Sequence, residues 1–305
     1  MKVGDFVVRR SYGEDITFKI IGIKENESGE QVYILKGVNL RIEADAPLDD
    51  LEIVSNYYLG KMDKIFNENA TRCIKKILRQ REKEYLVYSD LLKKSKIMRK
   101  NKNFKKNVNQ EFDEKMFFGR PGKVLHIDGD KEYLEVCLKT YRELSINVVG
   151  KVVPENRQPE IIVELVKEYR PDIVVLTGHD GMIRNAKNYI DIDNYRNSKY
   201  FVESVIQLRQ YEPDYDDLVI FAGACQSCYE AILDAGANFA SSPNRVLIHC
   251  LDPVLVCEKI AYTNIDKVVS IKDVIYNTIT GTKGIGGMQT RGKYREGFPK
   301  SLYIK

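Results

Sequence analysis

Three patterns of hydrophobic and polar positions follow one another along the chain. Residues 1–55 alternate polar and apolar positions in short runs, with a polar turn at 25–30, and this pattern predicts a small all-β domain. Residues 56–120 carry long side chains with intermittent apolar positions, which predicts a helical linker. In residues 121–305, short apolar runs alternate with amphipathic stretches, which predicts an α/β domain.

The third region predicts a mostly parallel sheet with helices on both faces. The expected strands are 123–126, 147–153, 172–177, 218–222, 246–248 and 267–270. The expected helices are 131–144, 159–169, 201–210, 229–234, 253–261 and 272–279. Strands that alternate with helices at this spacing build parallel units with right-handed crossovers. The glycine-rich stretch 281–292 is expected to be a mobile loop.

The first two regions predict accessory parts of the molecule. We expect residues 1–55 to form a small β-barrel of the SH3 or Tudor kind, in an accessory role rather than as a specific nucleic-acid binder. Residues 93–106 contain eight basic residues and no acidic one. Such a run is typical of a solvated, partly disordered linker, and it would also suit an acidic partner or a protease-accessible connection.

Composition sets broad limits on function. The chain has 305 residues, 43% of them hydrophobic and 30% charged, which is typical of soluble globular proteins. A net charge of +4 indicates no particular charged partner. The N-terminus lacks the apolar core of a signal peptide, and no apolar run is long enough for a membrane span, so we expect a cytoplasmic protein. Its six cysteines are then expected to be reduced and available for chemistry.

Cys225 is the strongest candidate for a reactive residue. It follows the apolar run 218–222 and the small residues Gly223 and Ala224, and a predicted helix begins shortly after it. A lone cysteine is more often a small buried hydrophobe, but a thiol near a helix N-terminus can be activated. Cys228, which lies three residues later, is expected to be a packing residue.

His179 is the leading candidate for a base. It follows the predicted strand 172–177 within the sequence Gly-His-Asp-Gly. The carboxyl ends of parallel strands meet at one edge of a sheet, so His179 and Cys225 would form a pair of nucleophile and base there. His126, at the end of the first strand, and His249 are the competing histidines.

The same edge would have to stabilise an oxyanion or hold a substrate. We assign this role to Asp180, Gly181 and Gly223, together with the backbone N–H of Cys225, because amides at strand ends and tight turns can stabilise developing negative charge.

Other chemistries fit the sequence less well. Cys225, Cys228, His249 and Cys250 supply zinc-type donors, but their spacing is not that of a normal zinc site, so we expect no metal. The glycine-rich tail lacks the phosphate-binding Gly-x-x-x-x-Gly-Lys-Ser/Thr pattern. A cysteine phosphatase would carry arginine six residues after its cysteine, where Ala231 stands instead.

Several motifs together resemble the YabG family of sporulation-specific peptidases from spore-forming Firmicutes. They are TGHDG at 177–181, FAGACQS at 221–227, AGANFASSP at 235–243, GIGG at 284–287, VGDFVVR at 3–9 and LRIEADAP at 40–47. The resemblance covers nearly the whole chain and is weakest in residues 56–116.

The resemblance implies a cysteine endopeptidase that processes spore coat and related proteins and needs no cofactor. The family's histidine and cysteine correspond to His179 and Cys225, in blocks that are also similar to the caspase and clostripain group. It further implies location in the mother cell of a sporulating cell, with association with the spore coat. Its partners would be proteins of the coat and cortex machinery, with no nucleic acid or membrane.

The resemblance also implies cleavage after basic residues, above all Arg. Such a preference needs an acidic pocket, for which the sequence offers Asp128, Asp130, Asp180 and Asp252. A peptidase of this specificity would meet sites on its own chain at Arg99 and Arg120, so self-processing in residues 93–120 is expected, and Arg99 is preferred because Pro121 follows Arg120.

Two other classes of function remain open at this stage. An amidotransferase-like or DJ-1-like enzyme would also place its cysteine on a strand–turn–helix elbow, but its histidine follows in sequence, which selects His249. A non-catalytic protein would use the N-terminal module and the basic segment to bind nucleic acid or an assembling spore coat.

Overall fold

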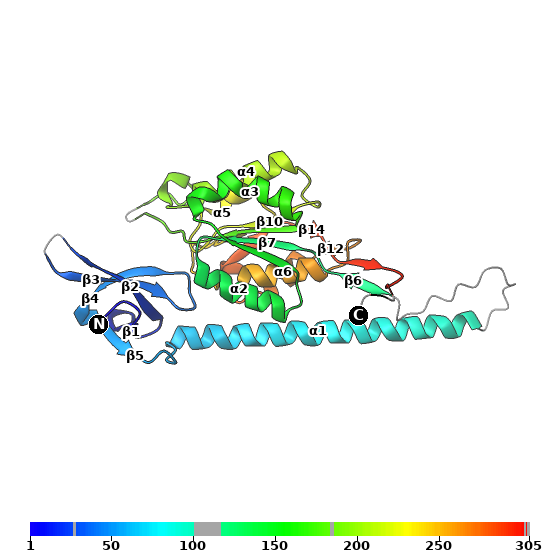
Figure 1. Cartoon of the computed structure of the whole chain (residues 1–305), viewed down its shortest axis with the longest axis horizontal. Coiled ribbons are helices and arrows are strands. Elements are labelled where there is room, and N and C mark those ends of the chain that lie inside the picture. The colour runs from blue at the N-terminus through cyan, green and yellow to red at the C-terminus, as the bar shows by residue number, and fades with distance from the viewer. Residues whose placement is uncertain (27–28, 101–116, 184–185, 302, 304–305) are drawn as a thin grey trace.

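Two sheets and a long helix organise the molecule. The computed structural model describes residues 1–26, 29–100, 117–183, 186–301 and 303. The N-terminal sheet lies at one end of helix α1 (Lys61–Lys100), and the larger central sheet with its helices lies along the side of that helix (Figure 1). None of the described helices combines the length and apolar composition that a membrane span requires.

The N-terminal sheet has five antiparallel strands, in the order β4-β3-β2-β1-β5. Their bounds are β1 Phe6–Arg9, β2 Thr17–Glu25, β3 Gln31–Gly37, β4 Glu43–Pro47 and β5 Leu51–Val54. Alternating apolar side chains such as Phe18, Ile20 and Leu35 fill its core, as the pattern predicts. The described strands show no pairing of β4 with β5, so closure into a barrel stays a prediction, as do the three domain boundaries.

The central sheet has six strands and is parallel except at one edge. Its order is β13-β11-β10-β9-β7-β8, and β13 runs antiparallel to β11. The strand bounds are β7 Val124–Asp128, β8 Val148–Val152, β9 Ile173–Thr177, β10 Val219–Ala222, β11 Phe239–Ser241 and β13 Ile285–Gly287. The prediction of a mostly parallel α/β sheet is confirmed.

Helices cover both faces of this sheet (Figure 1). The upper layer in that view holds α3 Gln158–Tyr169, α4 Ser198–Tyr211 and α5 Tyr229–Asp234. The opposite face carries α2 Lys131–Glu143, α6 Asp252–Tyr262 and α7 Ile271–Tyr276. On β9, Val174 and Leu176 pack with the α3/α4 cluster, whereas Ile173 and Val175 pack with the α2/α6 cluster, because side chains alternate along a strand.

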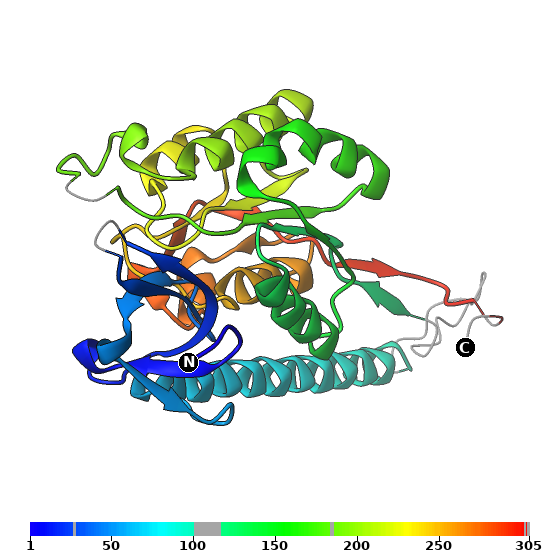
Figure 2. The ribbon, with the colours of Figure 1, turned by 60° about the vertical axis from the view of Figure 1, so that its left-hand side comes forward.

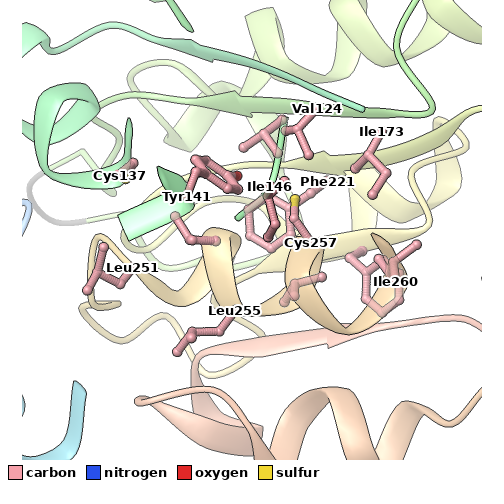
Figure 3. Close-up of a cluster of buried hydrophobic side chains, with 14 of the residues drawn as sticks. Val124, Cys137, Tyr141, Ile146, Ile173, Phe221, Leu251, Leu255, Cys257 and Ile260 are labelled. Carbon is pink, nitrogen blue, oxygen red and sulfur yellow. The ribbon is translucent and has the colours of Figure 1, made fainter. Parts of the chain in front are cut away.

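Figure 3 shows the core on the α2/α6 face. Val124 and Phe221 from the sheet meet Leu255, Cys257 and Ile260 from α6, and all five side chains are buried. Because α6 is apolar on most of its surface, it lies between the sheet and further chain rather than at the molecular surface.

Helix α1 packs along the layer formed by α2 and α6, as Figures 1 and 2 both show. Ala70 and Ile77 are buried in the core of the α2/α6 face. Arg81 donates a hydrogen bond of 2.8 Å to the carbonyl oxygen of Leu144 and forms an ion pair with Glu258. The prediction of helix in this region is therefore confirmed, whereas the solvated character expected for residues 93–106 stays a prediction. Part of the basic stretch, 101–106, lies outside the described residues.

Two predictions for the last third are wrong. The strand next to β10 is β11 at 239–241, whereas residues 246–248 form no strand. The glycine-rich stretch 281–292 is ordered rather than a mobile loop: it contains a short 3-10 helix (Gly281–Lys283), β13 and the strand Thr290–Arg291, and its glycines permit close packing. A Cβ on Gly286 would lie 2.4 Å from the hydroxyl oxygen of Tyr229, and one on Gly287 would lie 2.4 Å from the carbonyl oxygen of Asn238.

Two small antiparallel pairs complete the fold. They are β6 Phe118–Arg120 with β15 Arg295–Gly297, and β12 Val268–Val269 with β14 Thr290–Arg291. The second pair agrees with the strand expected near 267–270.

The strand order creates a switch point between β7 and β9. The chain leaves β7 through α2 to β8 on one side, and then returns through α3 to β9 on the other side of β7. Open α/β sheets bind ligands in the crevice at such a point. Here Arg41, from the connection between β3 and β4 of the N-terminal sheet, occupies it, with Nη1 2.8 Å from Oδ1 of Asp128 and Nη2 on the other carboxylate oxygen. Both side chains are fully buried.

We predict that Arg41→Met destabilises the protein by about 3–5 kcal/mol, because it leaves the Asp128 carboxylate buried without its counter-charge. Chemical denaturation of the full chain measures this loss. Arg10→Met is the matched control, since the Arg10 side chain is 60% exposed and its 3.6 Å pair with Glu52 should contribute little. The double variant Arg41→Met/Asp128→Leu should be more stable than Arg41→Met. Equal losses for Arg10 and Arg41 would contradict the prediction.

Candidate active site

Three neighbouring strand ends bring the candidate residues to one edge of the central sheet. Strands β7, β9 and β10 are adjacent and parallel. Asp130 follows β7, His179 follows β9 and Cys225 follows β10. The register pairs Ala222 with Leu176, so the residues that carry the imidazole and the thiol leave adjacent strands side by side.

His179 is held by a carboxylate. Its Nε2 lies 2.9 Å from Oδ2 of Asp130, and its side chain is 23% exposed. The His179 backbone N–H donates a 2.6 Å hydrogen bond to Oε1 of Glu155, and the ring packs against Tyr133 with centroids 5.8 Å apart. Nδ1 makes no hydrogen bond with any described residue, so it is the ring nitrogen that is available to accept a proton.

Asp130 joins the histidine to the N-terminal sheet. Its Oδ1 caps helix α2 by accepting hydrogen bonds from the backbone N–H groups of Glu132 and Tyr133. Lys36 Nζ lies 2.6 Å from Oδ2 and 2.7 Å from Oδ1. Burial alone would raise the pKa of Asp130, but the hydrogen bonds from His179 and Lys36 outweigh it and hold this pKa well below its usual range.

The same contacts act on Lys36. Burial would lower the pKa of Lys36, but its hydrogen bonds and charge interactions with Asp130 and Glu132 raise it. Both partners of the Lys36–Asp130 pair therefore stay charged at neutral pH.

Cys225 sits on the tight turn that its neighbours predict. Gly223 has φ of 107°, a conformation that favours glycine, and a Cβ there would lie 2.5 Å from Oγ of Ser241. The turn is closed by the N–H of Ala224, which donates a 2.8 Å hydrogen bond to the hydroxyl of Ser227.

The thiol itself is turned into the protein. Cys225 is only 1% exposed, and Sγ accepts a hydrogen bond from the backbone N–H of Ile248 at 3.3 Å. Burial raises the pKa of Cys225 to about 11, against the opposing effects of the Ile248 hydrogen bond and the charge of Arg41. Among the described residues, no hydrogen bond joins this thiol to His179.

The residues assigned to an oxyanion or substrate role lie at this edge, but some of their backbone N–H groups already donate hydrogen bonds within the protein. The N–H of Gly223 donates to the carbonyl oxygen of Leu176 at 3.0 Å, and that of Gly181 donates to the Asp180 side chain at 2.8 Å. Within the described chain, the N–H groups of Asp180 and Cys225 have no hydrogen-bond acceptor. They are therefore the better candidates for oxyanion donors.

The Asp180 carboxylate ties the two reactive loops together. It accepts hydrogen bonds from the hydroxyls of Ser198, at 2.5 Å, and Ser227, at 2.8 Å. Burial raises the pKa of Asp180, against the lowering effect of these hydrogen bonds. The loop of His179 and the loop of Cys225 are thus fixed to each other through one side chain.

The other residues that the sequence singled out lie in the core. His126 is fully buried in β7, where Nε2 lies 2.9 Å from the hydroxyl oxygen of Thr177. Cys228 is buried, with Sγ 3.6 Å from the carbonyl oxygen of Ile190. Asp252 is buried and accepts hydrogen bonds from the backbone N–H of Ile279 and the hydroxyl of Thr280.

His249 is buried, in contrast to the partly exposed His179. It is 3% exposed, and Nδ1 accepts a 3.1 Å hydrogen bond from the backbone N–H of Leu251. Its Nε2 is buried without a partner among the described residues, and its ring packs against Phe66 with centroids 5.7 Å apart. Burial, aided by the charge of Arg41, lowers the pKa of His249 to about 4.

The sequence did not reveal the residues that support His179. Asp130 could have been paired with it, because both follow apolar strands whose carboxyl ends share one edge. Glu155, Lys36 and Arg41 carried no local signal, since their contacts with this edge depend on how distant elements pack. Across the described residues, no group of three or more His, Cys, Asp or Glu side chains could hold a metal ion.

We predict that His249 makes stability depend on pH. Its pKa is about 4 in the folded protein and about 6.5 when unfolded, so its contribution is complete above pH 6.5 and is lost as the pH falls toward 4. Between pH 7 and pH 5 the wild type should lose about 2 kcal/mol more than His249→Asn, which keeps an acceptor but does not titrate. Urea denaturation at both pH values measures this difference, and equal losses would contradict the assignment.

Comparison with known proteins identifies the family. The family model described as YabG peptidase U57 matches residues 2–299. The sporulation-specific protease YabG of Bacillus subtilis (strain 168) is 40% identical over 304 residues, which cover 98% of each chain. A solved cobalamin-binding protein from Desulfitobacterium hafniense DCB-2 is 21% identical, with a TM-score of 0.27 over 45% of this chain and 57% of that one, a likeness too weak to support any conclusion. The first two matches show that this chain belongs to the YabG peptidase family.

Proposed function

We propose that this protein is a sporulation-specific cysteine endopeptidase in which Cys225 is the nucleophile and His179 is the general base and acid. The observation that carries the proposal is the carboxylate-bound, partly exposed imidazole at the strand end next to Cys225. Membership of the YabG peptidase family supplies the reaction class. The arrangement of histidine and cysteine on neighbouring parallel strands also supports the caspase-like fold that we expect.

The reaction would begin with a neutral thiol. As Sγ of Cys225 attacks the scissile carbonyl carbon, Nδ1 of His179 takes the thiol proton, and the oxyanion is stabilised by the N–H groups of Cys225 and Asp180. The imidazolium then protonates the leaving amine as the C–N bond breaks. Water, deprotonated by His179, attacks the thioester and releases the acid product and the thiol.

His179 suits this role better than His249. An imidazolium has to form during the reaction, and the carboxylate of Asp130 stabilises a positive charge on His179. His249 is buried, its imidazole has no carboxylate partner among the described residues, and burial lowers its pKa to about 4. These contrasts favour the peptidase over the amidotransferase-like alternative.

The substrates we propose are spore coat and related spore proteins, met in the cytoplasm of the mother cell and cleaved after basic residues. The four aspartates that could recognise such a residue are already bound: Asp128 by Arg41, Asp130 by Lys36, Asp180 by Ser198 and Ser227, and Asp252 by Thr280. Oε2 of Glu155 has no hydrogen-bond partner in the described chain. Because Oε1 binds the backbone of His179, Glu155 is the carboxylate we expect to face a basic substrate side chain.

We predict that Cys225→Ala abolishes cleavage of solubilised coat proteins and that His179→Ala lowers it by about 10²–10⁴-fold, the usual contribution of general acid–base catalysis. Mass mapping of cut sites measures both effects and tests the preference for Arg. Cys228→Ala is the matched control, because this thiol lies three residues away and packs in the core, and the variant should keep most activity. Cleavage by a protease-free preparation of Cys225→Ala would refute the assignment.

We also propose that the protein cuts its own chain within residues 93–120. The fold indicates which segments must open before the cut and how the two fragments stay together. Arg99 lies in α1, and Arg120 lies in β6, paired with β15, so either site must first leave regular structure. After a cut, the N-terminal fragment would still be attached through the buried Arg41–Asp128 pair and through Ile77 of α1.

We therefore predict that the wild-type chain is cut in this segment, that Cys225→Ala stays whole, and that the two wild-type fragments remain in one particle. Denaturing gels and intact mass would show the cut, and size-exclusion chromatography would show the retained complex. Separate elution of the fragments would contradict the docking argument. A wild-type chain that stays whole while it cuts added substrate would contradict self-processing.

A further inference from the structure

The N-terminal sheet contributes charged groups to the candidate active site. Lys36, near the end of β3, reaches Asp130 across the interface, and the Lys36 side chain is only 11% exposed. The single O–H of Tyr133 is shared between the carbonyl oxygens of Gly37, at 2.5 Å, and Leu40, at 2.6 Å, which fixes this part of the sheet against α2. The ring of Tyr133 lies between His179 and the cations of the N-terminal sheet, with Lys36 Nζ 5.0 Å from its centroid.

The geometry decides which imidazole nitrogen is free. An ionised carboxylate only accepts hydrogen bonds, so Nε2 of His179 must carry the proton in its contact with Asp130. In the neutral ring, Nδ1 is then the unprotonated nitrogen, as a base for Cys225 requires. Asp130 can keep this orientation because Lys36 and the helix cap hold both of its oxygens.

We propose that Asp130 and Lys36 are positioning residues that hold His179 in its reactive tautomer, so that the docked N-terminal sheet is part of the peptidase's working site. The inference rests on the proposed function, in which His179 is the general base. It implies that a central domain separated from the N-terminal sheet would have an incorrectly held histidine.

The expected effects on the pH profile have opposite signs. Activity requires neutral His179, and the acidic limb of the kcat/KM profile reports its protonation. Asp130→Asn removes a negative charge beside the ring, which disfavours the imidazolium and moves this limb to lower pH. Lys36→Met removes a positive charge and moves it to higher pH. The other titratable groups at this edge, which both variants retain, are Arg41, Glu132, Tyr133, Glu155, Asp180 and Cys225.

The variants are chosen to leave the fold intact. Asparagine is as good a helix cap as aspartate, so Asp130→Asn keeps the start of α2 while it removes the charge. The matched control is Lys19→Met, because Lys19 lies on the same sheet and pairs with Glu132 at 3.1 Å without reaching Asp130. Lys36→Arg retains the positive charge and should restore part of the activity that Lys36→Met loses.

The experiment measures kcat and KM against pH with an internally quenched peptide built on a cleavage site mapped from coat proteins. Asp130→Asn should lower kcat by about 10²-fold, near the lower end of the contribution of general acid–base catalysis. Lys36→Met should lower kcat by about 10-fold, the lower end of what loss of an outer-shell partner costs. KM should be little changed, and Lys19→Met should match the wild type. The proposal would be overturned if Lys36→Met kept the same kcat as Lys19→Met. It would also be overturned if the acidic limbs of Asp130→Asn and Lys36→Met moved in the same direction.

A second measurement does not depend on activity. The chain has three histidines, so nitrogen NMR of ¹⁵N-histidine-labelled protein can report the tautomer of His179, assigned with His179→Asn. We expect a protonated Nε2 in the wild type and in Lys19→Met, and a mixture of tautomers in Asp130→Asn. If the wild type is inactive but its His179 is protonated at Nε2, the proposed peptidase function is wrong and the orientation of His179 by Asp130 still holds. If His179 of the wild type is protonated at Nδ1, the proposed orientation itself is wrong.

Discussion

The buried ion pair between Arg41 and Asp128 is the contact on which the arrangement of the molecule depends. Two carboxylates, Asp128 and Asp130, leave the end of β7 close together, and one of them is fully buried. Placing these charges there without cations would cost several kcal/mol, so the edge of the central sheet is satisfied only when the N-terminal sheet is docked. Arg41 also lies 3.5 Å from the carbonyl oxygen of Gly178, immediately before His179. One interface therefore serves both folding and the candidate site.

The sequence predicted the part of this site that depends on strand periodicity. Cys225 and His179 each follow a short apolar run, and parallel strands bring their carboxyl ends to one edge, so their proximity could be inferred from the pattern alone. Arg41 and Lys36 could not be inferred in this way. They lie 87 and 94 positions before their carboxylate partners, and nothing in a local pattern indicates which surface a small sheet will cover.

The errors in the fold prediction share a physical origin, since tertiary packing overrode local composition. The glycines near 286 read as a mobile loop, yet the lack of a side chain is what lets the strand approach β11 and Tyr229 closely. Residues 246–248 have the composition of a strand, but their backbone instead holds the Cys225 thiol through Ile248.

The burial of Cys225 gives the contacts around His179 a role in the proposed mechanism. With a pKa raised by burial to about 11, forming the free thiolate at pH 7 would cost about 5 kcal/mol. Burial therefore favours the neutral thiol of Cys225 in this structure. In the proposed mechanism, the thiol proton would leave as Sγ attacks, and this step would require an imidazole nitrogen that is free to accept it. The Lys36–Asp130–His179 contacts would supply that acceptor under our proposal, because an ionised Asp130 fixes Nε2 as the donor and leaves Nδ1 free.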